Sequence, residues 1–301
     1  MKGALIDRGS GLLATERRPT PRAHGPGAVV DAVEAALGSL AREAARSELT
    51  VRRAGVVVPG IVDAERSLAV HSANIGWRDL PLAAVLEERT GLPVTLGHDV
   101  RAGALAEVRL GAARGSRDAL FVAIGTGVSA AAVSDGRLLT AGGYAGELGH
   151  LVVEPDGPPC PCGGVGCLET VASAAEIAAA YTALSGRPVV GAAEVAARLT
   201  GGDGAARAVW ARAVEGLATA LATAVTLLAP EVVVLGGGLA ESGGLLLDPV
   251  RTRLAEKLTF HRRPRLVAAA LGDRAGCLGA GLHAWEAADA HATRSCFSSG
   301  S

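Results

Sequence analysis

Aromatic residues, net charge and long apolar runs are all scarce in this sequence, and each shortage excludes a class of protein. Aromatics make up 3% of the 301 residues, so Ala, Val and Leu must fill the interior, which suits helices packed on sheets. A net charge of −1 argues against a nucleic-acid-binding surface, which normally needs a clustered basic excess. The longest uncharged stretches, 120–134 and 217–230, are too short to span a bilayer.

No early segment has the basic start and apolar centre of a signal peptide. We therefore expect a soluble, cytoplasmic protein with no nucleic-acid or membrane partner. In that compartment, clustered cysteines favour metal binding over disulfides. Apolar residues make up 49% of the chain and charged residues 20%, which allows a sizeable core, and the length suits two domains.

Hydrophobic periodicity and turn residues predict an α/β protein of two lobes with a cleft between them. The strands are expected at 4–7, 12–15, 56–58, 92–96, 119–123, 128–133, 138–140, 232–235 and 266–269. The helices are expected at 30–44, 80–88, 100–108, 168–184, 192–199, 205–228, 249–258 and 279–289. We expect a small lobe at 1–112, a large lobe at 113–278, a helix at 279–290 that returns to the small lobe, and a disordered tail at 291–301.

Three of the chain's five cysteines lie within eight residues, in the stretch CPCGGVGCLE. Cys160, Cys162 and Cys167 surround a glycine-rich turn, and His150 precedes them by ten residues. Together they can form a closed, tetrahedral Cys3His zinc site of the structural kind. Three buried free cysteines and a nucleic-acid-binding zinc knuckle are the alternatives, although the knuckle would need basic and aromatic neighbours that are absent here.

Acidic residues flank this cysteine segment. Glu147 and His150 are three residues apart in GELGH, and Glu169 directly follows the last cysteine motif. If one nitrogen of His150 binds zinc, the other can still donate to a ligand hydroxyl. Each residue alone is an ordinary surface group, but together they indicate a polyol-binding corner.

Two glycine-rich turns follow buried strands in the second half of the chain. Gly125-Thr126-Gly127 and Gly236-Gly237-Gly238 can expose backbone N–H groups to phosphate, or can be plain turns. Asp99 follows the strand expected at 92–96 and precedes a helix. It can be an N-cap, a ligand-binding carboxylate at the carboxyl end of a strand, or both.

The motifs GELGH and CPCGGVGCLE, in that order, resemble the signature of the ROK family of repressors, open reading frames and kinases. VPGIVD, SANIGW, HDVRAGALAE, AIGTGVS, VVVLGGG and LGDRAGCLGA extend the resemblance from about residue 2 to the last helix. It implies a two-lobed actin-like (ribonuclease H-like) ATPase fold with a structural zinc loop, usually dimeric. Kinases of the family phosphorylate the 6-hydroxyl of hexoses or N-acetylhexosamines with ATP and Mg2+.

The resemblance also implies roles for single residues. Asp99 matches the catalytic base, and the zinc ligands would be His150, Cys160, Cys162 and Cys167. The phosphate loop would be Gly125, Thr126 and Gly127, and the adenosine site Gly236, Gly237 and Gly238. The sugar contacts would be Gly60, Asn74, His98, Asp99, Glu147, His150 and Glu169.

The sequence departs from the family pattern in two places. The residue before the base is usually Asn, whereas His98 is bulkier and can titrate. Family kinases also begin with a strand that leads into an Asp-x-Gly-Gly-Thr phosphate loop, which the printed chain does not contain. We expect the reading frame to continue upstream by about ten residues, one short strand and its turn. We also expect the strand at 4–7 to have an unpaired edge and the printed chain to phosphorylate sugar poorly.

These observations predict a glucokinase-like hexose kinase that depends on ATP, Mg2+ and structural Zn2+ and forms a homodimer. Polyphosphate as donor remains open, as does the identity of the hexose. One alternative is a sugar-binding ROK protein that is catalytically impaired. The other is a sugar-responsive transcriptional regulator, which would carry a helix-turn-helix domain for which residues 1–3 leave no room.

Overall fold

The computed structural model describes the backbone of residues 1–298 and divides it into two compact units. Unit 1 contains residues 1–106, 140–145 and 273–298 of the described chain, and unit 2 contains 107–139 and 146–272. The boundaries at 106 and 273 differ from the expected 112 and 279. The chain also enters unit 1 for the six residues 140–145, which no sequence signal indicated.

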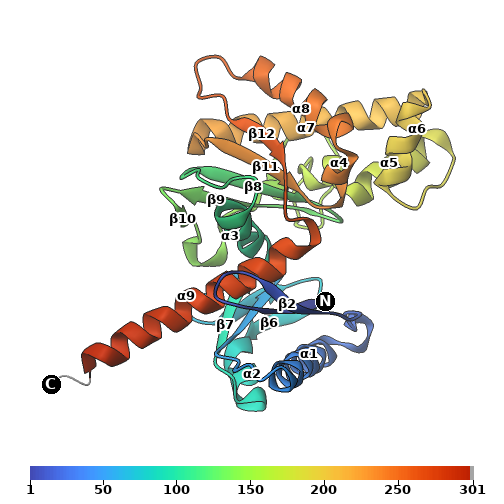
Figure 1. Ribbon diagram of the computed structural model, residues 1–301. Helices are drawn as coiled ribbons and strands as arrows, with labels where there is room; N and C mark the ends of the chain where they lie inside the picture. The colour runs from blue at the N-terminus through green and yellow to red at the C-terminus, as the bar shows by residue number, and fades with distance from the viewer. Residues whose placement is uncertain (299–301) are drawn as a thin grey trace. The chain divides into compact units, whose positions relative to one another are not determined.

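Unit 1 contains three small sheets and the helices that cover them (Figure 1). Its elements are β1 (Lys2–Ile6), β2 (Leu12–Arg17), α1 (Pro26–Arg46), β3 (Ala54–Val58), β4 (Ile61–Asp63), β5 (Leu68–Ser72), β6 (Trp77–Leu80), α2 (Leu82–Thr90), β7 (Val94–His98), the greater part of α3 (Asp99–Leu110), and α9 (Ala275–Ser298). β1 and β2 form the expected antiparallel hairpin, and β1 has no second neighbour among the strands of residues 1–298. β3 and β7 are parallel, whereas the antiparallel sheet β4-β5-β6 was not expected from the sequence.

The last helix, α9, packs directly on the first strands of unit 1. It contacts β1, β3 and β7 (Figure 1, red helix). The contact is close because small residues face one another: a Cβ added to Gly55 of β3 would overlap the backbone carbonyl of Ala280. The described part of the helix extends to Ser298, so the backbone at 291–298 is helical where a disordered tail was expected, and residues 299–301 lie outside the described part of the chain.

Unit 2 contains one five-stranded sheet in the order β10-β9-β8-β11-β12. Its elements are β8 (Ala119–Ile124), β9 (Val128–Ser134), β10 (Arg137–Leu138), α4 (Glu169–Ala172), α5 (Ala174–Ser185), α6 (Ala192–Thr200), α7 (Gly204–Leu228), β11 (Val232–Gly236), α8 (Gly244–Lys257) and β12 (Arg265–Ala268). β8, β11 and β12 are parallel, and β9 and β10 are antiparallel to their neighbours. Asp135 and Gly136 both have positive φ angles, 50° and 76°, which confirms the expected type I′ turn.

Two expected helices of unit 2 need correction. The helix expected at 168–184 is interrupted at Ser173, which is extended and accepts the N–H of Glu176 as the N-cap of α5. The helix expected at 249–258 begins at Gly244, so Pro249 lies in its second turn. The carbonyl of Leu245, which would receive the missing N–H, accepts the indole N–H of Trp210 instead.

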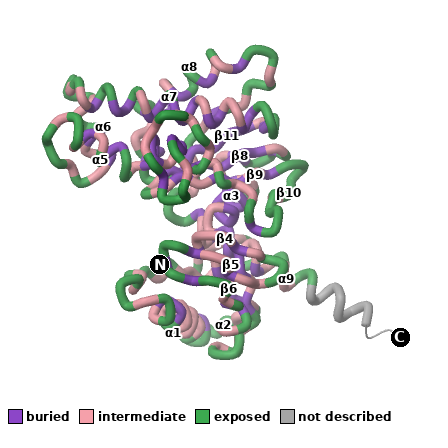
Figure 2. The backbone as a smooth tube through the Cα atoms, turned by 180° about the vertical axis from the view of Figure 1, so that it is seen from behind, coloured by how far each residue is buried: buried purple, intermediate pink, exposed green. Residues whose placement is uncertain are grey.

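Helix α7 forms the centre of the core of unit 2. Figure 2 shows buried residues, in purple, along β8, β11 and α7. By length and composition α7 is also the one helix of the described residues that is apolar enough to cross a membrane, but half of its most apolar stretch is buried within the fold. Asp203 caps its first turn and accepts from Ala205 N, Ala206 N and the hydroxyl of Tyr181.

Candidate active site

The register of two parallel strands brings the candidate residues of unit 1 to one end of a sheet. Val58 of β3 lies opposite His98 of β7, so Gly60 and Asp99 both follow the carboxyl ends of neighbouring strands. Gly60 has a φ of +103°, and a Cβ there would overlap the carbonyl oxygen of His71 in β5. The exposed Asn74 follows β5 by two residues. Gly60, His98 and Asp99 therefore belong to one edge of the β3–β7 sheet, as ligand-binding residues of open α/β sheets do. Asn74 follows a strand of the antiparallel sheet, whose residues His71 and Ser72 lie against Gly60.

Asp99 is the first residue of α3 and presents a partly free carboxylate. Its side chain is 43% exposed, and Oδ1 accepts the N–H of Val100 at 2.7 Å. Among the side chains and backbone of residues 1–290, Oδ2 has no hydrogen-bond partner. The position of Asp99 is compatible with both predictions from the sequence, the helix start and the ligand-binding carboxylate, because it begins α3 and still offers an oxygen to a ligand.

His98 is buried beside this carboxylate. Burial lowers the pKa of His98, the nearby Arg101 lowers it further, and Asp99 opposes both effects. A lowered pKa keeps the imidazole neutral at pH 7. Its Nδ1 lies 3.2 Å from the N–H of Val100 and so acts as an acceptor, which leaves the proton on Nε2.

Arg101 is a charged residue of this region that sequence reasoning missed. It is 5% exposed, and its Nη2 donates to the carbonyl oxygens of Gly143 at 2.6 Å and Ala145 at 2.9 Å. Nη1 donates to Val62 of β4 at 3.4 Å. The guanidinium therefore holds the 140–145 segment within unit 1. This segment ends two residues before Glu147. The signal in the sequence that could have identified Arg101 is its position directly before the apolar residues 102–106 of a predicted helix.

The two glycine-rich turns lie at the ends of neighbouring parallel strands of unit 2. Gly236 of β11 lies opposite Ala123 of β8, so both turns emerge from the same edge of the sheet. The 125–127 turn closes through Gly125 N to Gly127 O at 2.9 Å. Within the described chain, the N–H groups of Thr126 and Gly127 have no partner, which suits them to bind phosphate oxygens.

The cysteine segment brings four candidate metal ligands together. Ligand atoms of His150, Cys160, Cys162 and Cys167 lie within 4.8 Å of one another. His150 Nδ1 faces Cys160 Sγ at 3.8 Å, and the Cys162 and Cys167 sulfurs are 3.7 Å apart. One imidazole nitrogen and three thiols match the donor set of a tetrahedral structural zinc site.

The protonation of the thiols differs across this cluster. Burial raises the pKa of the Cys167 thiol to about 12, whereas the N–H of Gly164 lowers the pKa of Cys162. A bound metal would replace the proton of Cys167, because thiolates are the ligating form.

The two candidate sugar-binding glutamates of unit 2, Glu147 and Glu169, have different neighbours. Glu147 Oε2 lies 3.9 Å from Nε2 of His150, the nitrogen that faces away from Cys160. Glu169 instead turns toward the glycine turn, and its Oε2 accepts the N–H of Val128 at 2.8 Å. Glu147 and His150 thus form one side-chain pair, whereas Glu169 joins the cysteine segment to the 125–127 turn.

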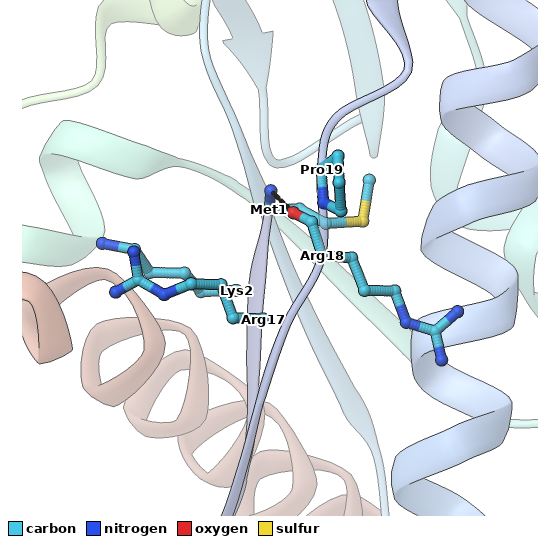
Figure 3. A pocket seen from close by; sticks show the side chains of 5 residues that line it. All are labelled: Met1, Lys2, Arg17, Arg18 and Pro19. Atoms are coloured by element: carbon cyan, nitrogen blue, oxygen red, sulfur yellow. Dashed lines mark hydrogen bonds between the residues drawn. The ribbon is translucent and has the colours of Figure 1, made fainter.

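A shallow cavity of about 510 Å3 lies elsewhere, along β1 and the end of β2 (Figure 3). It is lined by Met1, Lys2, Arg17, Arg18 and Pro19. Lys2 and Arg17 point to the same side in Figure 3, and both pair with Asp273. The cavity contains none of the candidate residues, and its cations are already neutralised in part.

Comparison with known proteins agrees with these motifs. A model of the ROK family matches residues 1–286. The chain is 36% identical to the glucokinase of Halalkalibacterium halodurans over 248 residues, 75% of this chain and 74% of the relative. It is 32% identical to the N-acetylmannosamine kinase of Salmonella heidelberg over 284 residues, 94% of each protein.

Solved structures resemble the chain over nearly its whole length. A ROK hexokinase from Thermus thermophilus has 35% identity and a TM-score of 0.80, covering 96% of this chain and 99% of its own. A ROK glucokinase from Streptomyces griseus, in complex with glucose and AMPPNP, has 30% identity and a TM-score of 0.79, with 94% and 95% covered. A ROK transcriptional regulator homologous to the E. coli MLC protein has 28% identity and a TM-score of 0.84, with 93% and 74% covered.

Proposed function

The chain belongs to the ROK family and is a sugar kinase with the α/β fold of that family, in the actin-like ATPase superfamily, and we propose that it transfers the γ-phosphate of ATP to the 6-hydroxyl of a hexose. The observation that carries the proposal is Asp99, a half-exposed carboxylate at the carboxyl end of β7 with one oxygen free. The glucokinase relative and the glucose–AMPPNP complex of the similar structure support this choice of substrates.

In this mechanism the free oxygen of Asp99 takes the proton of the sugar 6-hydroxyl as that oxygen attacks the γ-phosphorus. The new P–O bond forms as the bond to ADP breaks, and ADP leaves with the electron pair. The protein contributes mainly position and electrostatics, as phosphoryl transfer requires. The N–H groups of Thr126 and Gly127 would hold phosphate oxygens, Gly236, Gly237 and Gly238 would receive the adenosine, and Mg2+ would arrive with the ATP.

The sugar is held by groups that fit a polyol. His98 is neutral with its proton on Nε2, so it can donate to a hydroxyl, as an amide in its place would. Gly60 follows β3, and Asn74 follows β5, whose residue Ser72 lies close to Gly60. Glu147 and His150 supply an acceptor and a donor, and a zinc ion on His150, Cys160, Cys162 and Cys167 would fix the loop that bears them.

A coupled ADP-release assay over glucose, mannose, N-acetylglucosamine and N-acetylmannosamine tests the activity and identifies the sugar. Asp99→Asn should lower kcat by about two orders of magnitude or more and leave the sugar dissociation constant nearly unchanged. Asp63→Asn is the matched control, because Asp63 also lies at the end of a strand of unit 1 and accepts a backbone N–H, from Arg66. Wild-type turnover by Asp99→Asn would show that Asp99 only caps α3.

A sugar-binding regulator is the second candidate, and the similarity to the ROK regulator supports it. It would bind a hexose but release no ADP, so calorimetry beside the turnover assay separates the two functions. A homodimer and a cytoplasmic location are further parts of the kinase proposal, and light scattering tests the former.

A further inference from the structure

The 125–127 turn is fixed at both ends by the segment that follows the cysteine cluster. At its exit, the N–H of Val128 donates to Glu169 Oε2 at 2.8 Å. At its entry, the carbonyl of Gly125 accepts the N–H of Ala174 at 2.8 Å. All of these residues belong to unit 2. The turn therefore has little freedom of its own, and its two free N–H groups lie between two fixed points.

Glu169 contributes the stronger of these two contacts. A hydrogen bond from an N–H to an ionised carboxylate is shorter and stronger than one between neutral groups. The carboxylate also lies against the turn itself, because a Cβ added to Gly127 would overlap Oε2 of Glu169. Its other oxygen, Oε1, has no hydrogen-bond partner within residues 1–290, whose side chains the structure describes.

We propose that Glu169 is a positioning residue for the nucleotide: its carboxylate holds the 125–127 turn in the conformation that binds phosphate. The proposal rests on the proposed function, and it adds to the role that the family resemblance implies for Glu169, which is contact with the sugar alone. One carboxylate would then serve both substrates, with Oε2 on the turn and Oε1 left for a sugar hydroxyl.

The test measures the affinity of AMPPNP with Mg2+ by calorimetry in the absence of sugar, so that any loss of sugar contact cannot contribute. Glu169→Ala should weaken the nucleotide about tenfold, because the exit of the turn loses a charge-assisted hydrogen bond. Glu169→Gln keeps an acceptor and should restore the affinity to within about threefold of wild type. Glu154→Ala is the matched control. Glu154 lies near the cysteine segment, but its carboxylate binds Arg212 and not the 125–127 turn.

A double-mutant cycle gives an independent readout that a general loss of stability would not produce. Gly127→Ala should weaken nucleotide binding in the wild type, because the methyl group displaces the carboxylate. In the Glu169→Ala background the same change should cost almost nothing. Equal costs in both backgrounds, an unchanged nucleotide affinity in Glu169→Ala, or equal losses in the Ala and Gln variants would each overturn the proposal. If the wild type binds no nucleotide at all, the proposed kinase function fails instead.

Discussion

Removing the guanidinium of Arg101 should release the 140–145 segment without unfolding the rest of the protein. Arg101→Met keeps most of the side-chain volume but loses the two short bonds to Gly143 and Ala145. Hydrogen bonds to a charged group contribute about 1.5–3 kcal/mol each. The lower free energy per bond applies here, because the residues on either side of Gly143 are exposed and water can replace the lost donor at its carbonyl. The segment should then lose about 3 kcal/mol, which makes its opening about 100-fold more frequent.

Hydrogen exchange measures this opening directly. The N–H groups of Gly143 and Ala145 both donate to the carbonyl of Thr140, so their protection reports whether the segment is closed. Exchange there should accelerate about 100-fold in Arg101→Met, whereas exchange in α7 of unit 2 should not change. Arg53→Met is the control, because Arg53 also donates to a backbone carbonyl and a hydroxyl of unit 1, at Val94 and Thr95. Unchanged protection at 143–145, or a loss of protection throughout the chain, would refute the reasoning.

Three further predictions concern the metal, the sugar and acid stability. The wild type should carry about one zinc ion by elemental analysis, and Cys162→Ser should lose it while Cys277→Ser, outside the cluster, keeps it. A metal-free wild type would contradict this. Glu147→Ala should weaken hexose binding about tenfold, because a sugar hydroxyl loses a charged acceptor; an unchanged hexose affinity in calorimetry would remove Glu147 from the site. The backbone N–H of Ala206, the hydroxyl of Tyr181 and the guanidinium of Arg187 lower the pKa of Asp203 to about 2. Its contribution to stability is therefore complete above about pH 4 and lost as the pH falls toward 2. Asp203→Asn, which keeps the helix cap, should show a flatter loss of stability in that range in acid titrations followed by circular dichroism, and an identical acid profile would contradict the assignment.

The sequence predicted those features that depend on local chemistry. The Asp135-Gly136 turn, the β1–β2 hairpin and the grouping of three cysteines with His150 follow from residue types and short spacings. The break at Ser173 was also readable, because Ser followed three residues later by Glu is the signature of an N-cap. It was missed because the apolar pattern continues through it.

The features that were not predicted depend on contacts between distant residues. β4 and β6 have three and four residues, too few to show a periodicity. The excursion of 140–145 into unit 1 is stabilised by Arg101, some forty residues earlier. The orientation of Glu169 toward Val128 depends on where α4 lies, and α4 is placed by its packing on α7 and α5, so the sequence placed this residue beside the metal but not against the turn.

The packing of α9 on β1 and β3 determines when the core of unit 1 can be completed during synthesis. Unit 1 contains the first residues of the chain and also its last helix, so its core stays incomplete while the whole of unit 2 is synthesised. At roughly 5–20 residues per second, the roughly 190 residues between α3 and the end of α9 take about 10–40 s to translate. During that time the apolar faces of β1 and β3 that α9 covers remain accessible to chaperones, whereas unit 2 can already fold around α7. The core of unit 1, which carries Asp99, is therefore completed only when α9 has been synthesised and has packed on these strands.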